Sequence, residues 1–222
     1  MAAKQLRAAN RVRVKDDVLA VLRAAILEGS FAPGEHLNEA SLADQLEVSR
    51  GPIRDALSSL AHEGLVVIEP HKGATVPLMS KNDVDEIYTL RLALEMLAAK
   101  SAVVHATPED LSALGAATAD LAAVVDAGGS IRDITDADLR FHDAFYRAAH
   151  HQRLYASWRS VRSQVALCLF SRNTVSATSR EIVVGEHVQI LQLLMDRDQE
   201  SLVKAVDEHL RGAYERLVRH YD

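Results

Sequence analysis

Residues 47–66 read EVSRGPIRDALSSLAHEGLV, and this stretch decides the fold of the first part of the chain. Ser49 is a favourable N-cap, and Pro52 suits a first helical turn because its missing N–H would have no partner inside the helix. Apolar residues then recur on one helix face until a glycine ends the pattern. The stretch predicts a short amphipathic helix whose N-terminal end carries two cations, Arg50 and Arg54.

The sequence around this helix predicts two helices before it and a hairpin after it. Residues 14–28 have apolar positions at helical spacing, and a second helix is expected over 41–46, with Asn38 as its N-cap after a Pro-Gly turn. In the stretch LVVIEPHKGATVPL, β-branched residues flank a tip at 71–73, which predicts a two-stranded hairpin. Residues 14–79 are therefore expected to form a winged helix-turn-helix domain.

Beyond residue 80 nearly every segment has helical periodicity. Breaks are expected near Thr107-Pro108, Gly128-Gly129, His150-His151, 173–178 and Arg197-Asp198. They divide residues 80–222 into about six helices without strands, an all-α bundle. The fold class expected from the sequence is mainly α, with the winged helix-turn-helix domain ahead of this bundle.

The composition is that of a folded globular protein. A single cysteine, Cys168, excludes an internal disulfide framework. No apolar run follows the basic start, so we expect neither a signal peptide nor a membrane span. We therefore expect a cytoplasmic location and no membrane partner. The net charge of −6 argues by itself against a nucleic-acid binder. However, residues 1–13 form a basic arm without an acid, ahead of an acidic body.

Arg50 and Arg54 fit the chemistry of base reading. In a helix-turn-helix the N-terminal residues of the third helix enter the major groove, where arginine can bond guanine with two hydrogen bonds and free backbone N–H groups face phosphate. On an isolated helix the same residues would be ordinary surface charges, with Asp55 as a nearby partner. The expected wing and the basic arm favour the DNA-reading interpretation.

A second cluster of candidate residues lies in the helical part. Asp138 and His142 are four residues apart, so on a helix they share one face, and His187 and His209 follow on the last two expected helices. Imidazole and carboxylate suit a borderline divalent metal, here of the zinc, nickel or manganese class. Taken singly, each histidine is more often a surface or hydrogen-bonded residue, and ten histidines give some favourable spacings by chance.

Residues 26–76 resemble the DNA-binding domain of the GntR family of bacterial transcription regulators. The family pattern is present as Pro33-Gly34, Leu37–Glu39, Leu42-Ala43, Val48–Leu57, Glu63–Leu65 and Gly73. The resemblance implies that the DNA-binding residues are Ser49, Arg50, Gly51, Pro52, Arg54, Lys72 and Gly73, with the last two at the wing tip. Two positions depart from the common pattern: Ala40 stands where many relatives carry arginine, and Gly51 where they carry threonine.

The helical part resembles the FCD effector domain of the FadR-type branch of this family. The segments DLRFH, EHVQIL and DEHLRGA carry Asp138, His142, His187 and His209 in the order of that domain's metal ligands. The segment YTLRLALEMLAAKSA resembles its first helix, in which an arginine, here Arg91, faces the ligand cavity. About six helices indicate the shorter, VanR-like subgroup.

Together these resemblances imply a homodimeric regulator that binds a palindromic double-stranded operator. A small carboxylate effector would take open positions on the metal and pair with Arg91, and the usual sense would be repression relieved by ligand. Arg91 could also form a salt bridge with Glu95, one helical turn away. Two alternatives stay open: a metal sensor, and a helical metallohydrolase whose general base would be a carboxylate such as Glu95, Asp143 or Glu186.

Overall fold

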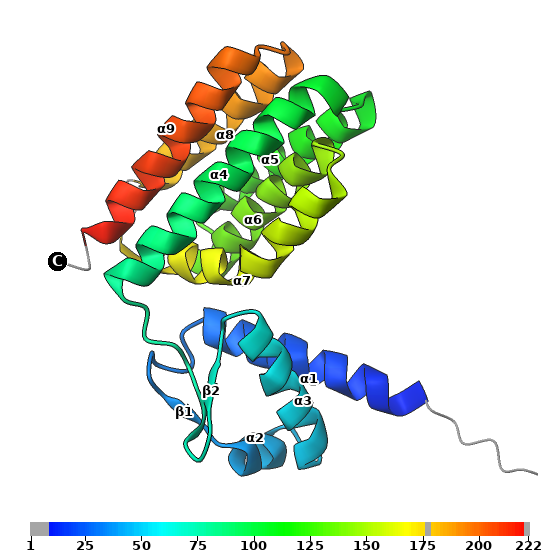
Figure 1. The fold of residues 1–222 in the computed structure, drawn as a ribbon, viewed down its shortest axis with the longest axis vertical. Helices are drawn as coiled ribbons and strands as arrows, with labels where there is room; N and C mark the ends of the chain where they lie inside the picture. The colour runs from blue at the N-terminus through cyan, green and yellow to red at the C-terminus, as the bar shows by residue number, and fades with distance from the viewer. Residues whose placement is uncertain (1–8, 176–178, 220–222) are drawn as a thin grey trace, which may run out of the picture. The chain divides into compact units, whose positions relative to one another are not determined.

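The computed structural model describes residues 9–175 and 179–219, and it describes the backbone alone at 9–13, 170–175 and 179–181. The described residues divide into two compact units after Leu78, and each unit is treated separately below. Both are mainly helical, as the sequence predicted (Figure 1).

The first unit contains three helices and three short strands among its described residues. They are α1 (Ala9–Leu27), β1 (His36–Leu37), α2 (Glu39–Gln45), α3 (Arg50–His62), β2 (Val67–Glu69) and β3 (Gly73–Thr75). Helix α1 begins earlier than the expected start at residue 14, so part of the expected basic arm is helical, while residues 1–8 lie outside the described residues. The winged helix-turn-helix prediction is confirmed in its helices and its hairpin.

The sheet is larger than the expected hairpin. Strand β1 pairs antiparallel with β3, which pairs antiparallel with β2, in the order β1-β3-β2. A strand of two residues leaves no alternation in the sequence from which to predict it. Gly73 begins β3 with a φ of 82°, and an added Cβ would lie 3.0 Å from Cε1 of His36. Glycine therefore allows both the turn and the close approach of β1.

Helix α3 is held by α1 and α2, which both pack against it. Its buried face contains Ile53, Leu57 and Leu60, at the helical spacing that the sequence shows. At the C-cap of α3, Arg23 of α1 donates to the half-buried carboxylate of Glu63, at 2.6 Å from Nη2 to Oε1. These contacts fix the direction in which α3 presents its N-terminal end.

The described residues of the second unit form six helices. They are α4 (Lys81–His105), α5 (Pro108–Asp126), α6 (Ile131–Ala148), α7 (Gln152–Val175), α8 (Ser179–Met195) and α9 (Gln199–Val218). Four of the junctions fall at predicted breaks because local chemistry ends and restarts each helix there. Of the fifth predicted break, 173–178, residues 176–178 lie outside the described residues. Helices α4, α5 and α6 each begin with a capping box, formed by Ser80 with Asp83, Thr107 with Asp110, and Ser130 with Asp133.

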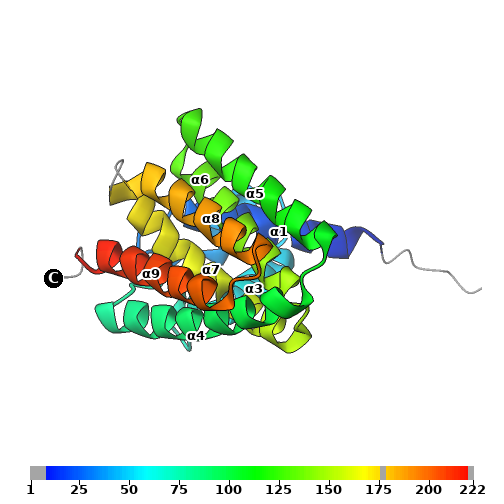
Figure 2. The same cartoon turned by 90° about the horizontal axis from the view of Figure 1, so that it is seen from above.

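Helix α6 lies in the interior of this bundle, with α4, α5 and α7 packed around it (Figures 1 and 2). Helices α4 and α9 lie side by side, and α8 packs against both α5 and α9. The aromatic core is dense beside α6, where the rings of Tyr146 and Trp158 stack at 4.6 Å. Within the described ranges, no helix combines the length and the apolarity needed to cross a bilayer.

Candidate metal and effector site and the DNA-reading helix

Three histidines from three helices meet in the centre of the second unit. His142 lies on α6, His187 on α8 and His209 on α9, and one ring nitrogen from each lies within 4.8 Å of the others. The exposed fraction of each side chain is 3% or less. Residues separated by up to 67 positions in sequence (142 to 209) are thus brought within ligand distance of a single ion.

Each of these rings is oriented through its Nδ1 atom. His187 Nδ1 lies 2.6 Å from the carbonyl of Val183, and His209 Nδ1 lies 2.7 Å from Glu186 Oε2. Because a carbonyl and a carboxylate can only accept, both rings must donate from Nδ1, and their Nε2 lone pairs stay available for a metal. Metal-binding histidines are commonly held in this way.

His142 is oriented by a buried ion pair. Glu95 Oε2 lies 3.2 Å from His142 Nδ1, and Arg91 bonds the same Glu95 through Nε at 2.7 Å. A second contact joins Arg91 Nη2 to His142 Nε2 at 2.7 Å. Since arginine can only donate, His142 accepts at Nε2, and its Nδ1 faces the Glu95 carboxylate without meeting the geometry of a hydrogen bond. Arg91 therefore bonds the atom that a metal would use.

Asp138 lies beside two of the histidines. One helical turn before His142, it places Oδ2 3.5 Å from His142 Nε2, and its Oδ1 lies 3.4 Å from His187 Nε2. Among the described residues, His187 Nε2 has no hydrogen-bond partner. A buried imidazole nitrogen without a partner is uncommon in a folded protein, and a cation held beside it would supply one. The four residues fit a divalent metal.

Burial keeps two of the histidines neutral. It lowers the pKa of His187 to about 3 against the pull of Asp138, and burial likewise lowers the pKa of His209 despite its bond to Glu186. Burial alone would raise the pKa of Glu95, but Arg91 and then His142 outweigh it and lower that pKa below its usual range. Neutral imidazoles beside ionised carboxylates are the protonation states that metal binding needs.

Arg91 forms the salt bridge to Glu95 that the sequence allowed beside a role in effector binding. Its side chain is 0% exposed. Its Cζ also lies 5.9 Å from the ring centre of Tyr88 and 6.0 Å from that of Trp158. Arg91 is thus part of the buried histidine cluster.

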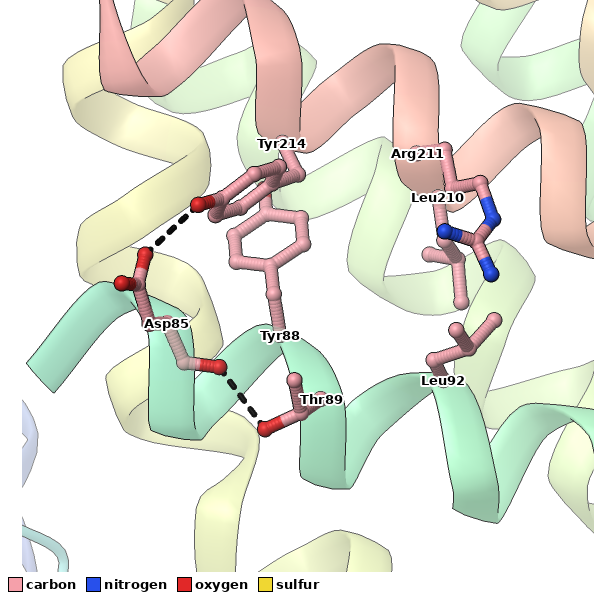
Figure 3. Close-up of a pocket in the computed structure, with 7 residues that line it drawn as sticks. All are labelled: Asp85, Tyr88, Thr89, Leu92, Leu210, Arg211 and Tyr214. Atoms are coloured by element: carbon pink, nitrogen blue, oxygen red, sulfur yellow. Dashed lines mark hydrogen bonds between the residues drawn. The ribbon is translucent and has the colours of Figure 1, made fainter. Parts of the chain in front are cut away.

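A surface pocket lies on the other side of Tyr88, between α4 and α9 (Figure 3). It has a volume of about 300 Å³ and is lined by Asp85, Tyr88, Thr89, Leu92, Leu210, Arg211 and Tyr214. Tyr214 donates to Asp85 Oδ1 at 2.7 Å, and the rings of Tyr88 and Tyr214 lie 5.7 Å apart. Tyr88 therefore contacts both the pocket and Arg91, so it separates the surface from the buried cluster.

The three carboxylates considered as general bases each contact a charged or hydrogen-bonding side chain. Glu95 and Glu186 orient His142 and His209. Asp143 accepts from Trp158 Nε1 at 2.7 Å and from Arg162 at 3.0 Å. Glu95 and Glu186 therefore hold imidazole rings of the cluster in place, and Asp143 contacts side chains outside the cluster.

In the first unit, helix α3 presents Arg50, Gly51 and Arg54 to solvent at its N-terminal end. Arg54 is held by Glu39 of α2 at 3.0 Å, and the neighbouring Asp55 is not its hydrogen-bond partner. This bond raises the pKa of Arg54, which carries a full positive charge in any case. The partner comes from another helix, so sequence proximity pointed to the wrong carboxylate.

Two further residues of the expected DNA-binding set, Pro52 and Ser49, lie at the start of α3. Pro52 is buried, so its contribution is to shape the start of α3 and its side chain offers no surface to DNA. Ser49 occupies the N-cap position as predicted, but its hydroxyl makes no capping hydrogen bond. That hydroxyl is exposed beside the first N–H groups of α3, where it could meet a phosphate. At the wing, Lys72 is exposed and pairs with Glu69 at 2.6 Å.

Comparison with known families assigns both units. Residues 14–76 match the family described as bacterial regulatory proteins, gntR family, and residues 86–212 match the FCD domain, which covers more than half of the chain. The chain belongs to the GntR family and carries an FCD domain. It is therefore a DNA-binding transcription regulator, as the sequence resemblance implied.

This GntR-family chain aligns with named transcription regulators over most of its length and of theirs. The Nta operon transcriptional regulator of Aminobacter aminovorans is 28% identical over 85% of this chain and 87% of its own length. The gluconate operon transcriptional repressor of Bacillus licheniformis is 26% identical over 91% of this chain and 83% of its own. Among solved structures, E. coli McbR/YncC matches with a TM-score of 0.81 at 24% identity, over 94% of this chain and 99% of that one.

Sequence reasoning about this GntR-family chain missed the residues that orient the histidines. Glu95 was recognised as a partner for Arg91, and Glu186 as a spare carboxylate, but neither was assigned to a histidine. The spacing of four between Arg91 and Glu95 was visible in the sequence. Nothing local signals that Glu186 reaches the following helix, because its contact with His209 spans 23 positions.

Proposed function

We propose that this GntR-family regulator is a repressor that a small organic acid releases by binding at a metal in the FCD domain. The observation that carries the proposal is the buried set of three imidazoles, a carboxylate and an arginine. Such a set attracts a divalent cation, and the cation in turn attracts an anionic ligand. Two relatives, from Bacillus licheniformis and Escherichia coli, bear the name repressor, which supports the proposed sense.

The metal would be held by Asp138, His142, His187 and His209. Their donor types suit zinc, nickel or manganese, and four protein ligands leave positions open on a six-coordinate ion. The metal would supply a localised positive charge for an anionic ligand. Glu95, Glu186 and the Val183 carbonyl would keep the three imidazoles in the correct tautomer and orientation.

The effector class follows from the charges around that position. A carboxylate could occupy the open metal positions while another of its oxygens accepts from Arg91. Arg91 would then exchange its bond to His142 Nε2 for one to the ligand, while Nε keeps its bond to Glu95. The pocket behind Tyr88 offers the ligand an approach from the surface, if the Tyr88 ring turns aside.

The DNA-binding side of the proposal rests on α3 and the wing. Arg50 and Arg54 would contact base edges or phosphates in the major groove, Ser49 and Gly51 the backbone, and Lys72 and Gly73 the region of the minor groove. One recognition helix reads one half-site, so a homodimer on a palindromic operator is the arrangement we propose. Ligand binding would act by favouring one of two arrangements of the DNA-binding domains.

Substitution of Arg54 by alanine should weaken specific DNA binding by about 1–3 kcal/mol and relax the preference at one base position. The reason is the loss of a side chain that can bond guanine twice. The measurement is a gel-shift titration on a DNA fragment that the protein itself selects from a random pool. Arg211→Ala, which removes an exposed arginine of α9, is the matched control. Equal affinity of wild type and Arg54→Ala would contradict the role of α3.

Small carboxylates should release the metal-loaded protein from the same DNA, whereas neutral sugars of similar size should not. The physical reason is the cationic character of the proposed site. Fluorescence anisotropy of labelled DNA, at fixed metal and increasing ligand, measures the release. A response to metal alone, unchanged by any acid, would instead indicate a metal sensor. Release by sugars and acids alike would contradict the carboxylate assignment.

A further inference from the structure

An arginine lies behind each of the two glutamates that face the histidine cluster. On α4, Arg91 Nε bonds Glu95 Oε1 at 2.7 Å, and the other carboxylate oxygen faces His142. On α9, Arg216 Nη2 donates to Glu186 Oε2 at 3.5 Å. The first pair is buried, whereas the exposed fraction is 21% for Arg216 and 23% for Glu186. The second arginine is thus placed to act on the cluster through its glutamate.

A single carboxylate oxygen of Glu186 connects this arginine to the cluster. Glu186 Oε2 accepts from His209 Nδ1 at 2.7 Å as well as from Arg216 Nη2. Helices α8 and α9, which carry these residues, lie side by side (Figure 2). Two donors that share one acceptor constrain its position from two directions, so a displaced guanidinium also changes the direction of the bond to the imidazole.

Gly212 makes room for the Arg216 side chain. His209, Gly212 and Arg216 follow each other at intervals of three and four residues, so they share one face of α9. A Cβ added at Gly212 would lie 3.1 Å from Nη1 of Arg216 and 3.7 Å from its Cζ. The guanidinium therefore lies back along the helix, over a position where glycine is otherwise less favourable than alanine.

The Arg216 side chain is held inward. Its Nε atom is buried and has no hydrogen-bond partner among the described residues. A guanidinium that served only as a surface charge would keep this donor in water, because a buried donor without a bond is unfavourable. The polar contact that accompanies this inward position is the one to Glu186.

We infer that Arg216 is a positioning residue of the metal site, and that Gly212 sets where its guanidinium lies. The inference rests on the metal binding of the proposed function. Arg216 holds the Glu186 carboxylate in the orientation in which it accepts from His209, and the imidazole then directs Nε2 toward the position of the cation. A residue two helical turns from His209 therefore adjusts the affinity for metal.

Arg216→Met should weaken metal binding by about 3- to 10-fold, because the side chain keeps an apolar stem and loses the donor to Glu186. Arg216→Lys, which keeps a cation that can donate, should recover part of this loss. The measurement is calorimetric titration of the metal-stripped full-length protein with whichever of Zn²⁺, Ni²⁺ and Mn²⁺ the wild type binds most tightly.

Gly212→Ala should weaken metal binding by about 2- to 5-fold, because the added methyl group displaces the guanidinium. Alanine favours the helix, so the thermal midpoint of the metal-free protein should be unchanged or higher. Gly115→Ala is the matched control, since a Cβ at this position inside α5 would meet Leu191 Cδ2 at the ordinary contact distance of 3.9 Å. It should gain similar helix stability and keep the wild-type metal affinity.

The metal-free protein offers a second readout. With isotope-labelled histidine, the Nδ1-bound proton of His209 should give a low-field NMR signal, because its bond to a carboxylate protects it from exchange with water. His209→Ala identifies the signal. Arg216→Met should broaden or remove it, whereas Gly115→Ala should keep it.

The outcomes separate the inference from the proposed function. A metal affinity of Arg216→Met equal to that of the wild type would overturn the inference and leave the metal site, and so would a His209 signal that this substitution does not change. Metal binding by Gly212→Ala as tight as by Gly115→Ala would overturn the part assigned to Gly212. A wild type that binds none of the three ions would overturn both the inference and the proposed metal site.

Discussion

Replacement of His187 by alanine should remove nearly all bound metal from the purified protein, and His209→Ala should do the same. A site that loses one of four ligands loses much of its affinity, and the two losses should not add. The helical content should persist, because α5, α6 and α8 also pack together through the buried apolar residues Leu121, Ile134 and Val183. The effect expected on metal content is the largest that any single substitution in this chain should produce.

The measurement is metal per chain by elemental analysis at neutral pH, together with circular dichroism. His62→Ala is the matched control, because His62 is an exposed histidine of α3 that bonds the carbonyl of Ser58. It should retain the wild-type metal content. Full stoichiometry in both His187→Ala and His209→Ala would refute the metal site, and the histidines would then be buried hydrogen-bonding residues.

Glu186→Gln, which alters the orientation of His209, should reduce metal affinity by about 10- to 100-fold.

Arg91→Ala should destabilise the FCD domain by about 3–5 kcal/mol, because it leaves the carboxylate of Glu95 buried without its partner. Both side chains of the pair are at most 1% exposed, so water cannot replace the lost contact. For a protein of this length, the thermal midpoint should fall by roughly 10 °C. The lower stability would by itself reduce the response to an effector near the unfolding temperature. Ligand responses of this variant must therefore be compared at temperatures at which it is folded.

The control is Arg211→Ala, which breaks an ion pair with the same spacing of four on the surface of α9. The Arg211 side chain is 64% exposed, so the expected loss is much smaller than that of Arg91→Ala. A double variant, Arg91→Met with Glu95→Gln, removes both buried charges and should recover much of the stability. Thermal unfolding by circular dichroism separates these cases. An Arg91→Ala midpoint equal to that of Arg211→Ala would mean that Glu95 is not stranded in the folded protein.

Most of the fold was predictable because its determinants are local. The junctions between helices carry their own capping residues, such as Ser130 before α6 and Thr107 before α5, and these act within one turn of chain. The two-residue strand β1 was not predictable, since it exists through its pairing with β3. The start of α1 was placed too late, because the apolar pattern that guided the prediction begins after residue 13.

The candidate site was predictable in its residue types and less so in its connections. Asp138 and His142 share one face of α6 because they are one turn apart, and this follows from helical geometry alone. The approach of His187 and His209 to that face depends on how α8 and α9 pack. In the sequence, only the resemblance to the FCD domain indicated that these two histidines approach Asp138 and His142. The folded structure gives the distances.

The sequence by itself determined which segments are helices, where they end, and which side of each helix is apolar, because these properties depend on neighbours within a turn or two. It also carried the GntR pattern around Arg50 and Arg54. The tertiary structure alone decided that Glu39 holds Arg54, that Glu186 orients His209, and that Arg91 is buried against His142. Each of these contacts joins residues of different helices. Charge and hydrogen bonding act across space once packing has excluded water, so no local pattern could specify the partners.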